Sequence, residues 1–116
     1  MGGMGMARVV ASPGVVAAGT VSLRVANQAA QTHELLVLPL PAGQAASARA
    51  VGANGQVDEA GSLGEASRTC GAGGGDGIAA GAVGWVTLAL ERGRYELVCN
   101  MPGHYAAGMH AELDVA

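Results

Sequence analysis

Short runs in which apolar and polar residues alternate constrain the fold of this chain more than any other feature. In residues 20–27, Val21, Leu23 and Val25 alternate with Ser, Arg and Ala, which is the period of a half-buried β-strand. Residues 85–90 alternate in the same way. Further short strands are predicted at residues 7–11, 34–38, 95–99 and 112–115. Short strands separated by Gly- and Pro-containing turns predict an all-β sandwich or barrel.

The middle of the chain lacks this alternation. Residues 44–84 are rich in Gly, Ala and Ser, and the Gly-rich run at 71–77 holds regular structure only at a large loss of backbone entropy. Residues 45–51 are long enough for one or two helical turns. A length of 116 residues fits one domain. We therefore predict a single domain over residues 1–116, with residues 44–84 as an irregular insertion within it.

Composition excludes several classes of function. The formal net charge is −3 and the six cationic residues are all Arg, so no basic cluster is present to neutralise the phosphates of a nucleic acid. No apolar run reaches the length of a membrane span. Residues 1–6 do not read as an export signal, so an export signal or a membrane tether would have to lie outside this chain.

The segment with the most chemistry follows the predicted strand 95–99. Cys99 ends that strand, Pro102 and Gly103 turn the chain, His104 lies on the returning loop, and Met109 precedes the last strand. A loop this short can direct a thiolate, an imidazole and a thioether towards one point. His33 opens the apolar run 34–38, and a strand beside the Cys99 strand would bring it to the same end of the sandwich.

The types of these side chains select a metal. Two imidazoles and a thiolate, with a weakly bound Met, describe a blue copper electron-transfer site. Zinc accepts Cys and His in a tetrahedral site, but it has no redox chemistry. Each of these residues taken alone has an ordinary structural reading, as a buried core thiol, a core Met or a surface His. Their combination predicts copper.

The spacing Cys99-x4-His104-x4-Met109, with His33 upstream, resembles the ligand loop of the cupredoxins. Within that family it is similar to rusticyanin and sulfocyanin, and the string GRYELVCNMPGHYAAGM looks like small bacterial copper-binding cupredoxins. The resemblance implies a Greek-key β-sandwich with one type 1 copper at one end. It also implies that His33, Cys99 and His104 are equatorial ligands, that Met109 is axial, and that the protein works in the periplasm or another extracytoplasmic setting.

The residue after the first ligand departs from the family pattern. Many cupredoxins have Asn or Ser there, and its hydrogen bonds tie the two ligand loops together. This chain has Glu34 instead. We expect Asn100 to make the tie by bonding to the Glu34 backbone, and the carboxylate to be able to alter the copper potential or compete as a ligand.

Four further residues have both a structural and a functional interpretation. His110 competes with Met109 for the axial position, but adjacent strand residues point to opposite faces, so His110 is expected to face solvent. Tyr105 either shields the site or is a half-buried ring. Trp85 is expected in the core. Cys70 has no His nearby and is expected to be a free thiol or to bridge two molecules, since a Cys70–Cys99 disulfide would remove the copper site.

Three functions fit these residues to different degrees. An electron-transfer protein fits best, with a redox partner docking on the small apolar residues around His104 and with no small-molecule substrate. A copper carrier or storage module without a redox task is the alternative, since carriers exchange metal through exposed sulfur. A copper enzyme is not expected, because further copper centres need more than the three His present.

Overall fold

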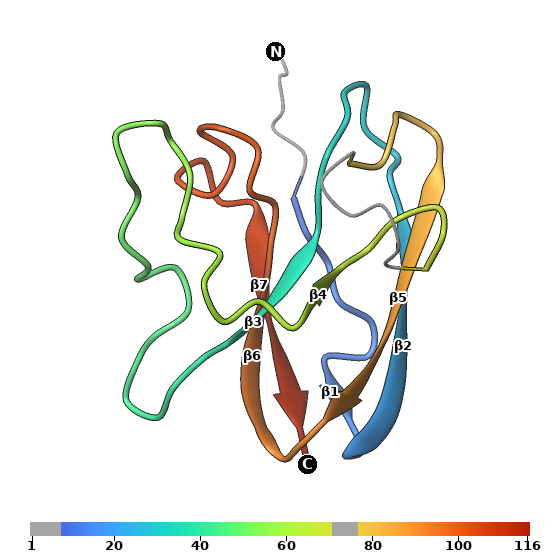
Figure 1. Cartoon of the computed structure of the whole chain (residues 1–116), viewed down its shortest axis with the longest axis vertical. Coiled ribbons are helices and arrows are strands. Elements are labelled where there is room, and N and C mark those ends of the chain that lie inside the picture. Colours follow the sequence, from blue (N-terminus) through green and yellow to red (C-terminus); the bar gives the residue numbers. More distant parts are fainter. Residues whose placement is uncertain (1–7, 71–76) are drawn as a thin grey trace.

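The computed structural model describes residues 8–70 and 77–116, and in this part of the chain every regular element is a β-strand. Five strands form a mixed sheet in the order β1-β7-β6-β3-β4, and β2 and β5 form a second, antiparallel sheet (Figure 1). The predicted all-β sandwich is confirmed. The strands are β1 (Val15–Val16), β2 (Gly19–Ala26), β3 (Leu36–Pro39), β4 (Gly64–Glu65), β5 (Val83–Leu90), β6 (Gly93–Val98) and β7 (His110–Val115).

The main core lies between the two sheets. On β2 the alternation predicted from the sequence is present, because Val21 is buried while Ser22 and Arg24 are exposed. On β6, Tyr95 and Leu97 point into the same core. Without Phe, the core is built mainly from aliphatic side chains. Its buried members are Val21, Leu35, Val37, Ala66, Ile78, Val86, Leu90, Tyr95, Leu97, Leu113 and Val115.

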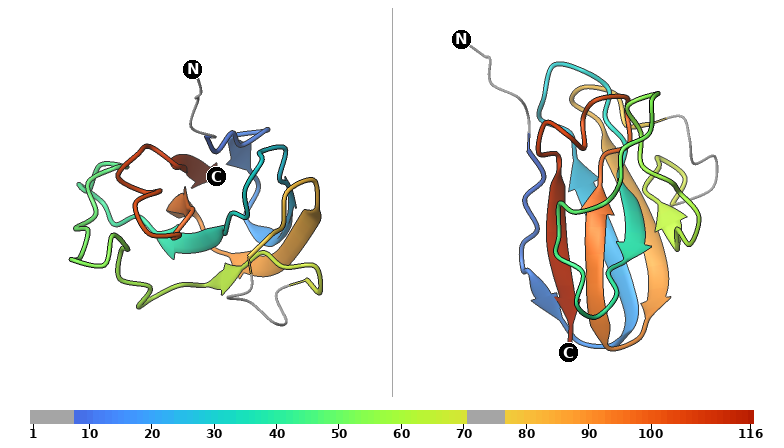
Figure 2. Two further views of the ribbon diagram at one scale, coloured as in Figure 1. Left: turned by 90° about the horizontal axis from the view of Figure 1, so that it is seen from above. Right: turned by 90° about the vertical axis from the view of Figure 1, so that its left-hand side faces the viewer.

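A second, smaller core lies on the outer face of the five-stranded sheet. It consists of Leu38, Val57, Val98 and Tyr105. Val57 comes from the segment 41–62, which runs beside the loop 99–109 on the outside of the sheet (green and red in Figures 1 and 2). The central strands β3 and β6 are therefore buried on both faces, which is why residues 35–38 read as a continuous apolar run.

The strand pairing gathers the predicted ligands at one end of the sandwich. Strand β6 is antiparallel to both β3 and β7, with Val98 opposite both Leu36 and His110. The end of β6 therefore lies beside the starts of β3 and β7. Cys99 follows β6, His33 precedes β3 and Met109 precedes β7, so all three lie at the end away from the C-terminus (Figure 1).

Three parts of the chain differ from the prediction. Residues 8–11 are not a strand, and residues 45–51 form a turn and a bridge rather than helical turns. Segment 44–84 contributes β4 and the start of β5, and it also places Val57, Ala66 and Ile78 in the two cores, so it is less irregular than expected. Residues 1–7 and 71–76, which include the N-terminal and Gly-rich predictions, lie outside the described residues.

Among the described residues, we find no helix with the length and apolar character needed to cross a membrane.

Candidate metal centre

Three predicted ligands meet at the end of the sandwich. The Nδ1 atoms of His33 and His104 are 3.1 Å apart, and the Cys99 Sγ lies 3.6 Å from the first and 3.4 Å from the second. A point equidistant from these three atoms lies about 2.0 Å from each, close to metal–imidazole bonds of about 2.0–2.1 Å and metal–thiolate bonds of about 2.3 Å. The three atoms are thus already spaced to share one metal ion.

Met109 is fixed to two of these residues through its backbone. Its carbonyl oxygen accepts a hydrogen bond from the Cys99 amide at 3.0 Å, and its own amide donates to the His104 carbonyl at 3.0 Å. The side chain is buried and, with His33, lines a cleft between β2 and the N-terminal segment. These backbone bonds fix the position of Met109 beside two members of the donor cluster.

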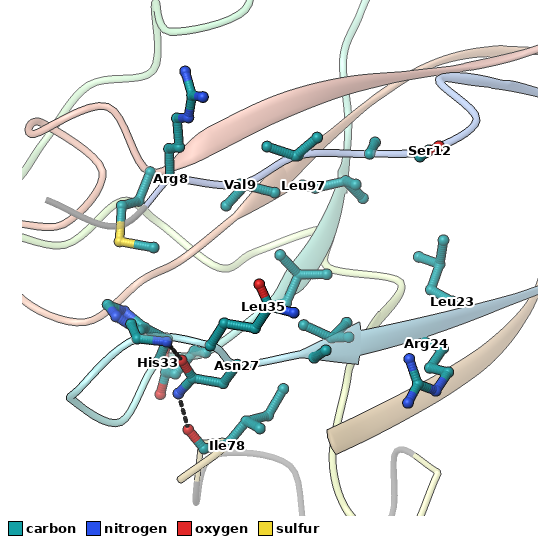
Figure 3. A pocket seen from close by; sticks show the side chains of 18 of the residues that line it. Arg8, Val9, Ser12, Leu23, Arg24, Asn27, His33, Leu35, Ile78 and Leu97 are labelled. Atoms are coloured by element: carbon teal, nitrogen blue, oxygen red, sulfur yellow. Dashed lines mark hydrogen bonds between the residues drawn. The ribbon is translucent and has the colours of Figure 1, made fainter. Parts of the chain in front are cut away.

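Hydrogen bonds to Asn27 and Ile78 fix the loop that carries His33. His33 and Ile78 exchange two backbone hydrogen bonds, of 3.1 and 2.6 Å. The Asn27 side chain donates to the Ile78 carbonyl at 2.7 Å and to the Gln31 carbonyl at 2.8 Å (Figure 3). A buried amide with both its donors satisfied fixes the loop that carries the first histidine.

The site favours neutral groups when no metal is present. Burial raises the pKa of the Cys99 thiol, and the backbone N–H groups of Met101 and Glu34 only partly oppose this by stabilising the thiolate. Burial and the neighbouring His104 lower the pKa of His33. At neutral pH, then, His33 is neutral and ready to bind, whereas Cys99 must lose a proton first.

Glu34 contacts the thiol through its backbone and not through its carboxylate. Its amide donates to the Cys99 Sγ at 3.4 Å, while its Oε1 is buried without a hydrogen-bond partner among the described residues. Burial, followed by repulsion from Glu65 and Glu59, raises the pKa of Glu34 to about 7. The carboxylate is not part of the His33–Cys99–His104 cluster.

Known proteins resemble this chain over most of its length. The family model described as the sulfocyanin (SoxE) domain matches residues 12–116. The chain belongs to the sulfocyanin family. Among curated proteins, none matches it.

Solved cupredoxin structures share its fold. Auracyanin B is 25% identical with a TM-score of 0.62, covering 88% of this sulfocyanin-family chain and 75% of its own. Reduced auracyanin from the photosynthetic bacterium Roseiflexus castenholzii is 21% identical with a TM-score of 0.59, and the match covers 88% of this chain and 82% of that auracyanin. Reduced rusticyanin is 20% identical with a TM-score of 0.56, and the match covers 88% of this chain and 60% of rusticyanin. The predicted resemblance to the cupredoxins is confirmed.

The donor set fits copper, the metal of this family. Rusticyanin, one of these structural neighbours, is a copper protein. In this sulfocyanin-family chain, two imidazole nitrogens and one sulfur form a nearly equilateral triangle. The backbone of Met109 is hydrogen-bonded to the backbones of Cys99 and His104. That combination is the one that suits copper in both oxidation states. The prediction of a single copper cofactor is confirmed at the level of the family and of the cluster that would hold it.

Asn100 does not make the predicted bond to the Glu34 backbone. Its Oδ1 accepts from the Val57 amide at 2.8 Å, and its Nδ2 donates to the Val57 carbonyl at 3.1 Å and to Glu59 at 2.8 Å. The Gln56 side chain adds a bond of 2.8 Å to the Asn100 carbonyl. The ligand loop is therefore tied to segment 41–62, a contact that no local sequence pattern predicts.

Gly55 allows this segment to approach the ligand loop closely. Its carbonyl accepts from the Gly103 amide at 2.8 Å, its φ is +80°, and a Cβ there would lie 2.8 Å from the Gly103 nitrogen. Gly61 has a similar φ of +85° but open space around it. We expect Gly55→Ala to lower the free energy of unfolding by about 3 kcal/mol and Gly61→Ala by about 1–2 kcal/mol. Equal losses in urea unfolding would show that the backbone contact with Gly103 is unimportant.

Several single-residue expectations are corrected by the structure. His110 does not face solvent freely: its side chain is 19% exposed and its Nδ1 lies 3.5 Å from the buried Glu96. Trp85 is 39% exposed and lies outside both cores. Tyr105 is buried. Cys70 and Cys99 are both unbridged, as the copper prediction requires, with Cys70 exposed and Cys99 buried.

Proposed function

We propose that this chain is a type 1 copper protein that carries single electrons, with His33, Cys99, His104 and Met109 as its ligands. The observation that carries the proposal is the triangle of two Nδ1 atoms and one Sγ, with sides of 3.1, 3.4 and 3.6 Å. Copper bound there would supply one-electron exchange between Cu(I) and Cu(II).

Burial of the thiol favours electron transfer over a carrier role. Cys99 is 0% exposed, and its sulfur contacts the backbone N–H groups of Glu34, which precedes β3, and of Met101 on the ligand loop. A carrier hands metal to its partner by exchanging ligands, which needs an accessible sulfur. The chain's own contribution is to hold three donors at fixed separations and to keep water away from the sulfur, so that the two oxidation states can share one geometry.

The surface around His104 suits a redox partner. His104 is half-buried, and small residues around it are exposed: Pro102, Gly103, Ala106, Ala107 and Gly108. We propose that the partner docks on this surface, where a brief encounter buries little area. Under this proposal the protein binds neither a nucleic acid nor a small-molecule substrate. The proposal places the protein in the periplasm or another extracytoplasmic setting.

Copper addition tests the proposal directly. One equivalent of Cu(II) is added to metal-free protein, the visible spectrum is recorded, and the product is cycled electrochemically. We expect an intense blue thiolate–copper band, a reversible one-electron couple, and slow loss of copper to a competing chelator. Copper that leaves rapidly and shows no reversible couple would favour the carrier function, and the absence of a band would contradict a type 1 site.

Copper affinity should increase with pH. Burial raises the pKa of Cys99, so the metal-free thiol is protonated at pH 7 and copper binding releases its proton. Below that pKa each pH unit multiplies the thiolate fraction by about ten, and the affinity should rise by about the same factor. His33, whose pKa is lowered, adds no slope near pH 7. Competition titrations with Cu(I) between pH 6 and 8 measure the slope, and a flat profile would mean that the thiol is already ionised.

A further inference from the structure

A fully buried carboxylate lies beneath the ligand loop. Glu96 projects from the outer face of β6 and is 0% exposed. Its oxygens accept hydrogen bonds from the Ser47 amide at 2.8 Å, the Arg49 Nε at 2.7 Å and the Tyr105 hydroxyl at 3.0 Å. The His110 Nδ1 lies 3.5 Å away. A buried charge persists only when it is paired and hydrogen-bonded, so these donors are required as a set.

Two of the partners of Glu96 directly follow proposed ligands in the sequence. Tyr105 follows the proposed ligand His104, and His110 follows the proposed ligand Met109. The Tyr105 and His110 rings are 4.9 Å apart, centre to centre, on the same face of the sheet. Glu96 therefore bonds to the neighbour of one ligand and contacts the neighbour of the other.

Arg49 links Glu96 and Tyr105 to segment 41–62, which covers the outer face of the sheet. Besides its bond to Glu96, Arg49 donates its backbone N–H to the Tyr105 hydroxyl at 3.2 Å and a guanidinium N–H to the Pro39 carbonyl. Its side chain is only 15% exposed. Any movement of Tyr105 out of this group would remove two hydrogen bonds from a buried site, which is costly.

We propose that Glu96 is a positioning residue that holds His104 and Met109 in binding geometry before the metal arrives. The inference rests on the proposed function for the identity of the ligands. In this role Glu96 touches neither the ligands nor the metal, and it acts through Tyr105, His110 and Arg49. Removing the carboxylate should loosen the ligand loop while leaving the distant β2–β5 sheet intact.

Amide hydrogen exchange in the metal-free protein tests this role. In Glu96→Gln we expect the amides of Gly108 and Met109, which bond to the Tyr105 and His104 carbonyls, to exchange at least about tenfold faster. The amides of the β2–β5 ladder should keep their rates. The matched control is Glu112→Gln, which lies opposite Glu96 on β7 but pairs with Arg94 instead of with the ligand loop, and should leave both sets unchanged.

Two further measurements keep the result interpretable. Tyr105→Phe retains the Glu96–Arg49 pair and should loosen the same loop amides selectively, even if Glu96→Gln does not fold. In both variants we expect the ring signals of His33 and His104 to broaden or split relative to those of the wild type. Exchange that accelerates equally throughout the chain, or unchanged loop amides in Tyr105→Phe, would overturn the positioning role. A wild type that binds no copper would instead contradict the proposed function, and the exchange rates would still decide the role of Glu96.

Discussion

Replacing Cys99 with serine should abolish the blue band and lower Cu(I) affinity by more than a hundredfold. The Cys99 Sγ is one corner of the proposed donor triangle, 3.4–3.6 Å from both imidazole nitrogens. A serine hydroxyl stays protonated near pH 7 and is a hard ligand for a soft ion. Changing residues that only orient ligands typically costs about 10–100-fold in metal affinity, so losing a ligand should exceed that range. Absorption spectroscopy and chelator competition measure both effects.

Cys70 provides the matched control for this experiment. It is the other cysteine of the chain, and it is exposed and unbridged near Thr87, on β5. Cys70→Ser should leave the band and the affinity unchanged. If Cys70→Ser also removed the band, a metal shared between two molecules would explain the colour better than the buried site. If Cys99→Ser kept the band, the thiolate–copper assignment would be wrong.

The ligand loop could be predicted from sequence because its geometry is local. Three of the four proposed ligands lie within residues 99–109, after a strand whose alternation is clear. His33 could be added because it precedes a run of apolar residues that reads as a central strand. Antiparallel pairing of β3, β6 and β7 then brings these positions together without any further assumption.

Contacts across long sequence separations could not be predicted in this way. Alternation on β6 would leave Glu96 and Val98 facing solvent, yet both are buried because segment 41–62 covers that face. The same covering explains why His110 is not solvent-facing and why Asn100 bonds to Val57. A Gly- and Ala-rich segment has little periodicity, so its docking against the sheet has no sequence signature.

Two strands and one aromatic residue show the other limits of the pattern. Strands β1 and β4 have two residues each, too short for a period to be recognised. Trp85 alternates correctly on β5, but alternation does not say which of the two faces is covered. The face carrying Trp85 lies outside the core, and the neighbouring Val86 is buried instead.

Leu113→Ala should lower the free energy of unfolding of the metal-free protein by about 3–5 kcal/mol. Leu113 is 0% exposed and lies on β7 within the core between the sheets. Deleting its side chain leaves a cavity among aliphatic neighbours, and no Phe is present elsewhere to add apolar area. Leu63, 43% exposed, is the matched control, and Leu63→Ala should cost less than about 1 kcal/mol. Urea unfolding measures both values, and equal losses would mean that the core is not where the structure places it.

Copper should restore much of this stability, which links the core to the site. Domains of this size have about 5–15 kcal/mol in total, so Leu113→Ala brings the metal-free protein close to unfolding. Ligand at a hundred times its dissociation constant adds about 2.7 kcal/mol when only the folded state binds it. The unfolded chain has no preformed donor triangle, because His33 and Cys99 are brought together only by the pairing of β3 with β6. Copper should therefore raise the melting temperature of Leu113→Ala, and the Cys99→Ser change added to it should remove that increase.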